Sequence, residues 1–339
     1  MPLCLYMGSN MVERNKIYIG NALTILKSFP DEFVDCVITS PPYYGLRDYG
    51  IKEQIGLEKT FEEYIQKLVD VFREVKRVLK KSGTFWLNVG DTYNRLGLYY
   101  EINKRNGNGN GTSIERVELP SKNLLGIPWR LAFALQEDGW ILRQDIIWHK
   151  TNTRPESVLD RCTKAHEYVF LFVKEPKYYF DMDSIKEPSV DEESYTGRRP
   201  RFKKNPYSQR FCDETSVGKT YPFRHKRSVW TVGVSNYRGE HFATFPEELI
   251  KPMILAGCPE YVCSNCGNPK NWYQSCDCQT GEKRGLVLDP FIGTGTTGLV
   301  AKKLNRDWIG IELNPKYARQ AESRIGSIGE RIELEGIYL

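Results

Sequence analysis

Two short segments, far apart in the chain, carry residue types suited to holding a nucleoside and acting on it. In the later segment Asp289 ends an apolar run, and Gly293, Gly295 and Gly298 follow with the spacing G-x-G-x-x-G. Glycines at these intervals let the backbone turn sharply and approach a ligand above the N-terminus of a helix. Glu312 ends the next apolar run, about twenty residues after the first glycine, where a carboxylate can accept hydrogen bonds from ribose hydroxyls. We therefore predict a strand–loop–helix–strand nucleoside site, the alternative being a tight structural turn without a ligand.

The surroundings of these glycines restrict which nucleoside they could bind. No Lys-Ser/Thr pair follows them, so this loop is not a phosphate-cradling P-loop. Asp289 would repel the pyrophosphate of a dinucleotide but suits the cationic amino group of an amino-acid moiety. Only about forty residues follow Gly298, too few for the remaining strands of a doubly wound sheet. The missing strands must come from the N-terminal half, which predicts a circularly permuted sheet.

The earlier segment, Thr39-Ser-Pro-Pro-Tyr43, directly follows a predicted strand. Two consecutive prolines lack backbone donors and keep the chain extended, so we expect their carbonyls to be fixed acceptors without local partners. Ser40 adds a hydroxyl, and Tyr43 adds an aromatic face. Such a set can accept both N–H bonds of an amino group on a flat ring while the tyrosine stacks on that ring. Holding both N–H bonds would direct the nitrogen lone pair toward an incoming electrophile.

Local patterns supply the elements that must position both segments. Apolar runs alternate with helix-period runs in the order strand, helix, strand, helix, strand, which predicts a parallel sheet. The predicted strands are 16–20, 34–38, 84–89, 140–148, 166–173, 286–288 and 307–312, and the predicted helices are 22–28, 61–79, 128–136, 247–256 and 299–304. We expect Ser82-Gly83 to end the long helix, and strands 140–148 and 166–173 to close the sheet as an antiparallel edge.

Composition is that of an ordinary globular protein. The chain has 339 residues, 40% of them hydrophobic and 27% charged, with a net charge of +5. No stretch approaches the roughly eighteen apolar residues of a membrane span, and the N-terminus lacks a signal-peptide pattern. We therefore expect a cytoplasmic protein without a membrane partner. We expect its nine cysteines to be reduced thiols or metal ligands rather than disulfides.

A basic stretch interrupts the periodic pattern between residues 176 and 240. From 197 to 227 there are ten Lys or Arg residues against two acids, with aromatic residues interleaved. Cations would bind phosphates and aromatic side chains would contact bases, so this stretch is a candidate for duplex DNA recognition. The alternative is a solvated basic loop. The candidate DNA-binding residues are Arg198, Arg199, Arg201, Lys203, Lys204, Arg224, Lys226 and Arg227.

A cysteine-rich segment, 258–278, precedes the glycine loop. Cys263 and Cys266 form a Cys-x-x-Cys pair, and Cys276 and Cys278 form a Cys-x-Cys pair. Four thiolates can bind one zinc ion tetrahedrally, so the pattern favours a structural zinc site over free thiols. Cys258 is a spare candidate ligand. A catalytic zinc keeps an open position and typically has a His or carboxylate ligand, and neither is evident among the spaced cysteines, so the expected role is structural.

The two segments together resemble the paired signatures of S-adenosylmethionine-dependent DNA methyltransferases that methylate exocyclic amines. Ser-Pro-Pro-Tyr precedes Asp-Pro-Phe-x-Gly-Thr-Gly-Thr-Thr, as in the beta-type permutation of that family. The resemblance implies a Rossmann-like, doubly wound, mostly parallel α/β sheet with an inserted target-recognition region. It divides the chain into a catalytic part (1–175), a basic target-recognition region (176–240) and a cofactor-binding part (241–339).

The resemblance also implies roles for individual residues. Ser40, Pro41, Pro42 and Tyr43 would hold a base flipped out of the duplex, because its amino group cannot be reached inside the stack. Asp289 would face the amino group of the cofactor, and Glu312 its ribose hydroxyls. The implied cofactor-binding residues are Asn21, Thr39, Phe245, Asp289, Pro290, Phe291, Gly293, Thr294, Gly295, Thr296 and Glu312. Asn21 departs from the acid that the family has at this position.

Ser40 at the first motif position resembles the members that methylate N4 of cytosine, and the same reaction on adenine is the alternative. The expected partners are double-stranded DNA and a cognate restriction endonuclease. A nicotinamide-dependent oxidoreductase would need further strands after Glu312, and a zinc-containing DNA-binding module would leave both motifs without a use. Methylation of RNA or protein stays open, although the basic aromatic stretch favours a duplex.

Overall fold

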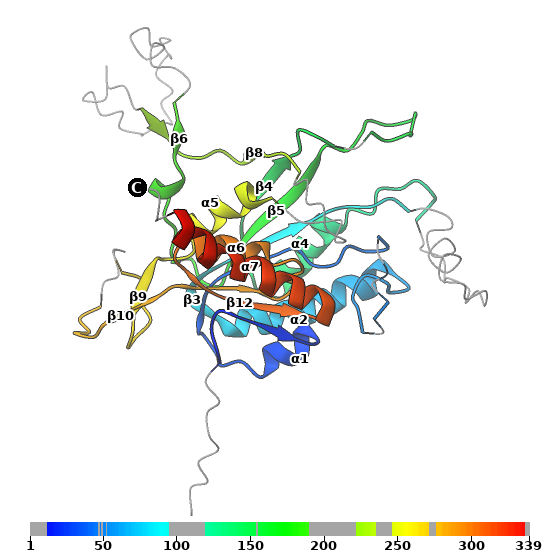
Figure 1. The fold of residues 1–339 in the computed structure, drawn as a ribbon. Coiled ribbons are helices and arrows are strands. Elements are labelled where there is room, and N and C mark those ends of the chain that lie inside the picture. Colours follow the sequence, from blue (N-terminus) through cyan, green and yellow to red (C-terminus); the bar gives the residue numbers. More distant parts are fainter. Residues whose placement is uncertain are drawn as a thin grey trace, which may run out of the picture.

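The computed structural model describes residues 12–46, 48, 50–51, 53–94, 119–153, 155–189, 222–234, 246–270 and 276–335. An eight-stranded sheet runs through its centre in the order β1-β12-β11-β2-β3-β5-β4-β8 (Figure 1). Its strands are β1 (Lys16–Ile19), β2 (Val34–Thr39), β3 (Leu79–Val89), β4 (Ile141–His149), β5 (His166–Val173), β8 (Val229–Thr231), β11 (Leu286–Asp289) and β12 (Asp307–Glu312). The first five strands of this order are parallel, and β5 is antiparallel to both of its neighbours.

Helices cover both faces of the sheet. One face carries α1 (Ala22–Lys27), α2 (Phe61–Val78) and α4 (Ile127–Glu137), and the other carries α5 (Glu247–Gly257), α6 (Thr296–Lys303) and α7 (Pro315–Glu335). The buried apolar side chains form two clusters, one under each helix layer. This is the doubly wound, mostly parallel α/β fold that the sequence predicts.

The central strands are mostly apolar because both faces of the sheet are covered. In β2, Val34 and Val37 pack into the cluster with α2, whereas Cys36 and Ile38 pack into the cluster with α5. All six residues of this strand are buried. Burial on both faces fixes the strand in the middle of the sheet, and its last residue at the edge where the Ser-Pro-Pro-Tyr segment begins.

Strand pairing joins segments from the two ends of the chain. β11 lies between β12 and β2, and pairs Val287 with Cys36 and Leu288 with Val37. The strands missing after the glycine loop are thus supplied by the N-terminal half, as predicted. The permutation itself stays an interpretation of this chain order.

Two local predictions were wrong. The long helix ends at Val78, and β3 begins at once because Leu79 is extended and buried. Gly83 therefore lies inside a strand, at a register shift between β2 and β3. A Cβ there would lie 2.5 Å from Leu79 Cδ1 and 2.9 Å from the Asp35 carbonyl oxygen, so the glycine serves close packing and does not end a helix. Strand 140–148 was expected at the edge, but β8 pairs beyond it, parallel to β4.

Three smaller features complete the described fold. β9 (Tyr261–Cys263) and β10 (Glu282–Arg284) form an antiparallel hairpin before β11, and β6 (Glu187–Pro188) pairs with β7 (Phe223–Arg224). A short 3-10 helix, Asp183–Ile185, precedes β6. Among the described residues, no helix combines the length and the apolar character needed to cross a bilayer.

Candidate active site

A cavity of about 660 Å³ opens where the parallel strands end. It is lined by residues that follow β1, β2, β11 and β12, and by residues of β3, β4 and β5. In parallel α/β sheets ligands bind at this carboxyl edge. Because β2 and β11 are adjacent, the Ser-Pro-Pro-Tyr segment and the glycine loop reach the same cavity.

The glycine loop turns sharply between β11 and α6. Gly293 and Gly295 have φ angles of 51° and 83°, in the left-handed region that side chains rarely adopt. Glu312, at the end of β12, accepts hydrogen bonds from the backbone N–H of Gly293 (3.0 Å) and of Asn314 (2.8 Å). Burial raises the pKa of Glu312, although these backbone donors oppose the shift. Its carboxylate lines the cavity beside the loop, as expected of a group that binds ribose hydroxyls.

Asp289 lies beneath the cavity and is not part of its lining. Its side chain is buried, and its carboxylate accepts hydrogen bonds from Thr39 Oγ1 (2.6 Å), Thr297 Oγ1 (2.7 Å) and the N–H of Phe291 (3.0 Å). Burial raises its pKa to about 6 against the effect of these donors. In this arrangement the Asp289 carboxylate ties β11 to β2 and fixes the turn into the glycine loop. The contact between Asp289 and the amino group of the cofactor stays a prediction, because Asp289 lies next to the lining residue Pro290 but is not itself part of the lining.

The Ser-Pro-Pro-Tyr segment presents Ser40 and Tyr43 side by side. Ser40 Oγ lies 3.3 Å from the Tyr43 hydroxyl. One expectation was wrong: the Pro42 carbonyl is not free, because it accepts a hydrogen bond from the Tyr64 hydroxyl at 2.8 Å. The Pro41 carbonyl has no hydrogen bond within the described part of the chain, and Pro41 lines the cavity. Of the two proline carbonyls, that of Pro41 therefore keeps both lone pairs for a ligand, and that of Pro42 keeps one.

A polar network behind Tyr43 was not predicted. The Tyr43 hydroxyl donates to Glu167 Oε2 at 2.8 Å, and Asn88 Nδ2 donates to the same oxygen at 3.2 Å. Lys150 forms an ion pair with Glu167 Oε1. Burial, and then the Glu167 charge, raise the pKa of Tyr43 well above its usual value, so the hydroxyl stays protonated. These partners fix the position of the Tyr43 ring.

This network could have been predicted from the sequence only if the order of the strands had been known. Asn88 is the penultimate residue of β3, at the carboxyl edge, whereas Glu167 is near the start of β5. Because β5 is antiparallel to β3, its first residues lie at that same edge.

A second unpredicted support is Arg324 of α7, which donates to Thr296 Oγ1 (2.9 Å) and to the Thr294 carbonyl (3.2 Å). It braces the glycine loop from outside.

Most of the predicted site residues meet at the cavity. Those lining it are Ser40, Pro41, Pro42, Tyr43, Asn21, Pro290, Phe291, Gly293, Thr294, Thr296 and Glu312. Thr39, Asp289 and Gly295 are not part of the lining, and Phe245 lies outside the described residues. The Asn21 side chain accepts a hydrogen bond from the Thr24 N–H and so caps α1.

The predicted DNA-binding residues are described only in part. Arg224 and Arg227 both form ion pairs with Glu187, at 3.0 Å and 2.8 Å. The Lys226 ammonium lies 5.1 Å from the centroid of the Trp230 ring. Arg198, Arg199, Arg201, Lys203 and Lys204 lie outside the described residues. The two arginines therefore already have a carboxylate partner within the protein.

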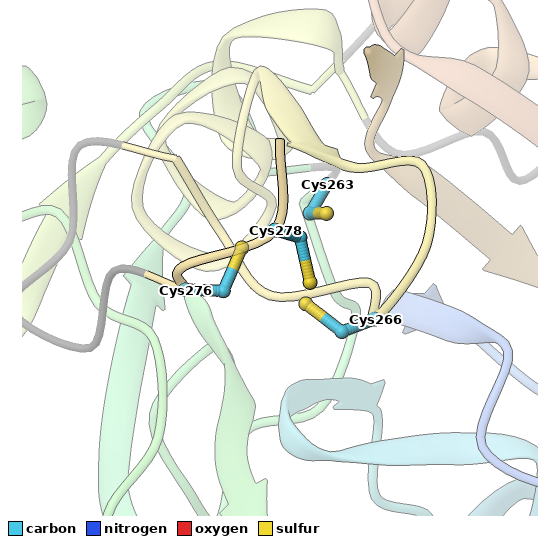
Figure 2. Close-up of side chains that lie close together, drawn as sticks. All are labelled: Cys263, Cys266, Cys276 and Cys278. Carbon is cyan, nitrogen blue, oxygen red and sulfur yellow. The ribbon is translucent and has the colours of Figure 1, made fainter. Parts of the chain in front are cut away.

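The cysteine-rich segment lies away from this cavity. Cys263, Cys266, Cys276 and Cys278 converge, with their sulfur atoms within 4.8 Å of one another (Figure 2). Cys258 lies outside this group and is fully buried, and burial raises the pKa of its thiol well above its usual value. The four predicted metal ligands thus come together, and the spare cysteine does not join them.

Comparison with known proteins identifies the family. The family model described as DNA methylase matches residues 34–323. The type II methyltransferases M.SmaI of Serratia marcescens and M.XycI of Xanthomonas campestris pv. cyanopsidis are 42% and 41% identical to this chain. The alignments cover 91% and 96% of this chain, and 90% and 89% of the two relatives. The solved PvuII DNA methyltransferase (cytosine-N4-specific) has the same fold, with a TM-score of 0.56 at 20% identity over 93% of this chain and 91% of that chain. The chain therefore belongs to the DNA methylase family, the S-adenosylmethionine-dependent enzymes that methylate exocyclic amines of DNA bases, as its two motifs predict.

Proposed function

We propose that this protein transfers the methyl group of S-adenosylmethionine to N4 of a cytosine flipped out of duplex DNA. The observation that carries the proposal is the shared cavity. Two motifs about 250 residues apart in the chain meet there because β2 and β11 are hydrogen-bonded neighbours. A cofactor on the glycine loop and an amino group on Ser-Pro-Pro-Tyr would thus face each other.

On the cofactor side, Glu312 is suited to accept hydrogen bonds from the two ribose hydroxyls. Gly293 and Thr294 bring backbone close to the methionine part, and Phe291 adds an apolar wall. Asn21 would contact the adenine amine. Asp289 is proposed to act indirectly, since its carboxylate holds Thr39 and the Phe291 turn in place.

On the base side, the Pro41 carbonyl and the Ser40 hydroxyl would accept the N–H bonds of the amino group. Tyr43, held by Glu167, would stack on the ring. The nitrogen lone pair would then attack the methyl carbon in line, S-adenosylhomocysteine would leave as the carbon–sulfur bond breaks, and the methylated nitrogen would give its extra proton to water. The amino nitrogen needs no strong base, because methylation itself acidifies its proton. Positioning and hydrogen bonding thus supply most of the catalysis.

The choice of cytosine rests on Ser40 at the first position of the motif. The PvuII enzyme, whose name states that it is cytosine-N4-specific, has the same fold. Methylation of the adenine amine is the second candidate, because the same acceptors would fit either amino group.

The biological role of the protein is also a proposal. Relatives named type II methyltransferases support a role in restriction-modification beside a cognate endonuclease. Region 176–240 would recognise the target, between catalytic residues 1–175 and cofactor-binding residues 241–339. A cytoplasmic location is proposed, because both DNA and the cofactor are available there.

The test is to incubate the purified protein with duplex DNA and methyl-labelled S-adenosylmethionine, digest the DNA, and identify the labelled nucleoside by mass. We expect N4-methyl-deoxycytidine. Tyr43→Ala should reduce turnover by roughly 100-fold or more but leave cofactor affinity nearly unchanged. N6-methyl-deoxyadenosine would overturn the choice of cytosine. Cofactor binding without label in the DNA would overturn the proposal that duplex DNA is the substrate.

A further inference from the structure

The four converging cysteines lie on a hairpin that the methylation reaction does not use. β9 and β10 are three residues each, and the cysteines occupy the turn between them and the end of β9. So short a two-stranded hairpin is marginally stable in water without further support. Tyr261, at the start of β9, is 38% exposed. A cross-link or a metal is the ordinary way to stabilise such a segment.

The local backbone has the form of a metal-binding knuckle. Cys263 and Cys266 flank a turn in which the Gly267 N–H donates to the Cys263 carbonyl at 3.0 Å. Gly267 has φ of 72°, so a glycine suits the position after the second cysteine. The Cys263 N–H donates in turn to the Asn268 carbonyl at 2.9 Å. The sulfur atoms of Cys263 and Cys266 converge with those of Cys276 and Cys278 (Figure 2).

The donor set selects the metal. Sulfur atoms bound to a zinc ion at about 2.3 Å lie about 3.8 Å from one another. The four sulfur atoms here all lie within 4.8 Å of one another, so contraction by at most about 1 Å would bring them to that spacing. Four thiolates without a water or a carboxylate form a closed tetrahedral set, which zinc prefers. The cysteines are not joined by disulfides. We infer that Cys263, Cys266, Cys276 and Cys278 bind one structural zinc ion.

The hairpin is tied to the amino ends of three central strands. Lys80 of β3 donates to the Gly267 carbonyl at 3.2 Å and pairs with buried Asp35 of β2 at 2.5 Å. The other oxygen of Asp35 accepts the Leu286 N–H at the start of β11. A zinc tetrathiolate has a net charge of −2, and the positive charge of the Lys80 ammonium at the turn would partly neutralise it. The metal would therefore fix the hairpin against the edge from which β2, β3 and β11 begin.

This position separates the metal from the reaction. Asp35 and Ser40 lie five residues apart along β2, roughly 17 Å at about 3.3 Å per residue. The zinc site is thus at the edge opposite the cavity. Its loss should weaken the fold without removing a group that touches cofactor or base.

The test is the metal content of the full-length protein, purified without chelator and measured by elemental mass spectrometry. We expect one zinc per chain in the wild type and none in Cys278→Ser, whose melting temperature should fall by on the order of 5 °C or more. Cys162→Ser is the matched control, because Cys162 is exposed and lies outside the cluster. It should keep the metal and the melting temperature.

A second measurement covers the case in which Cys278→Ser does not fold. Wild-type protein treated with a mercurial should release one zinc per chain, detected with a colorimetric chelator, and lose thermal stability. Protein produced with cobalt should show the visible absorption of a tetrahedral thiolate site. Substoichiometric metal, iron in place of zinc, or disulfides among the four cysteines would each overturn the inference.

Discussion

At the scale of single residues, a buried carboxylate (Asp289) and a half-buried one (Glu312) near the cavity differ in what they can still bind. Asp289 accepts three hydrogen bonds, from two threonine hydroxyls and a backbone N–H, and does not line the cavity. Glu312 accepts one backbone N–H on each oxygen and lines the cavity, so each oxygen keeps a lone pair for a ligand. The first is suited to hold the strands together and the second to bind the ribose of the cofactor.

This difference predicts a pH dependence for cofactor binding. Ribose hydroxyls donate to the ionised form of Glu312, and burial raises its pKa above the usual value for glutamate. Affinity should therefore be full above this raised pKa and fall, toward tenfold per pH unit, as the pH drops below it. Calorimetric titration of S-adenosylmethionine between about pH 5 and pH 8 would measure this.

Glu312→Gln is the matched variant for that titration. It should weaken binding by roughly tenfold or more at neutral pH, because a hydrogen bond to a charged acceptor is lost. The acid-side fall should also disappear. If the fall persists unchanged in Glu312→Gln, it belongs to another group, with Asp289 and its pKa of about 6 the first candidate.

At the scale of elements, the glycine loop depends on close packing of α6 against its neighbours. A Cβ at Gly298, inside α6, would lie 3.0 Å from the Trp308 ring of β12 and 2.9 Å from Ile325 Cδ1 of α7. The third glycine of the motif thus sets the distance between helix and sheet. Arg324, one residue before Ile325, holds the loop that leads into α6.

Two glycine-to-alanine substitutions in neighbouring helices should have opposite effects. Gly298→Ala should lower the free energy of unfolding by about 1–3 kcal/mol, because the Trp308 ring cannot yield easily. Gly326→Ala, on the exposed side of α7 with no atom within 4 Å of the new Cβ, should raise it by up to about 1 kcal/mol. Urea denaturation of both variants is the measurement. A stabilising Gly298→Ala would contradict this account of the packing.

At the scale of the whole molecule, the sheet separates two tasks. The carboxyl edge carries the reaction cavity, and the amino edge carries the cysteine hairpin. Binding to DNA requires positive charge, and the net charge of +5 is small. The binding charge must therefore be concentrated, and the basic stretch within 176–240 is where the sequence concentrates it.

The salt dependence of DNA binding should distinguish the basic residues. Removing one cation that binds a phosphate should reduce the slope of log K against log salt by about 0.9. Replacing three arginines together by Ala, namely Arg198, Arg199 and Arg201, should lower the slope by up to about three times that amount. Arg224→Ala and Arg227→Ala should change it less, because both arginines are paired with Glu187. Fluorescence anisotropy over a salt series is the measurement, and equal slopes for the two sets would contradict the prediction.

The amino-acid sequence alone was enough to predict the fold class, the order of most strands and helices, and both motifs. These depend on short-range chemistry: apolar runs, helix periods, glycines that allow sharp turns, and prolines that remove donors. Eleven of the predicted catalytic and cofactor-binding residues line the cavity, where the pairing of β2 with β11 brings the two motifs together. The cysteine cluster was also legible, because its spacing is a local property.

Which groups remain free for a ligand depends on the tertiary structure. The Tyr64 hydroxyl donates a hydrogen bond to the Pro42 carbonyl, and the hydroxyls of Thr39 and Thr297 donate to the Asp289 carboxylate. Glu167 reaches Tyr43 only because β5 is antiparallel to β3. A hydrogen bond between residues more than a hundred positions apart depends on strand order and direction, which local patterns do not encode. The sequence thus supplies the candidate groups, and the fold decides which of them can still bind.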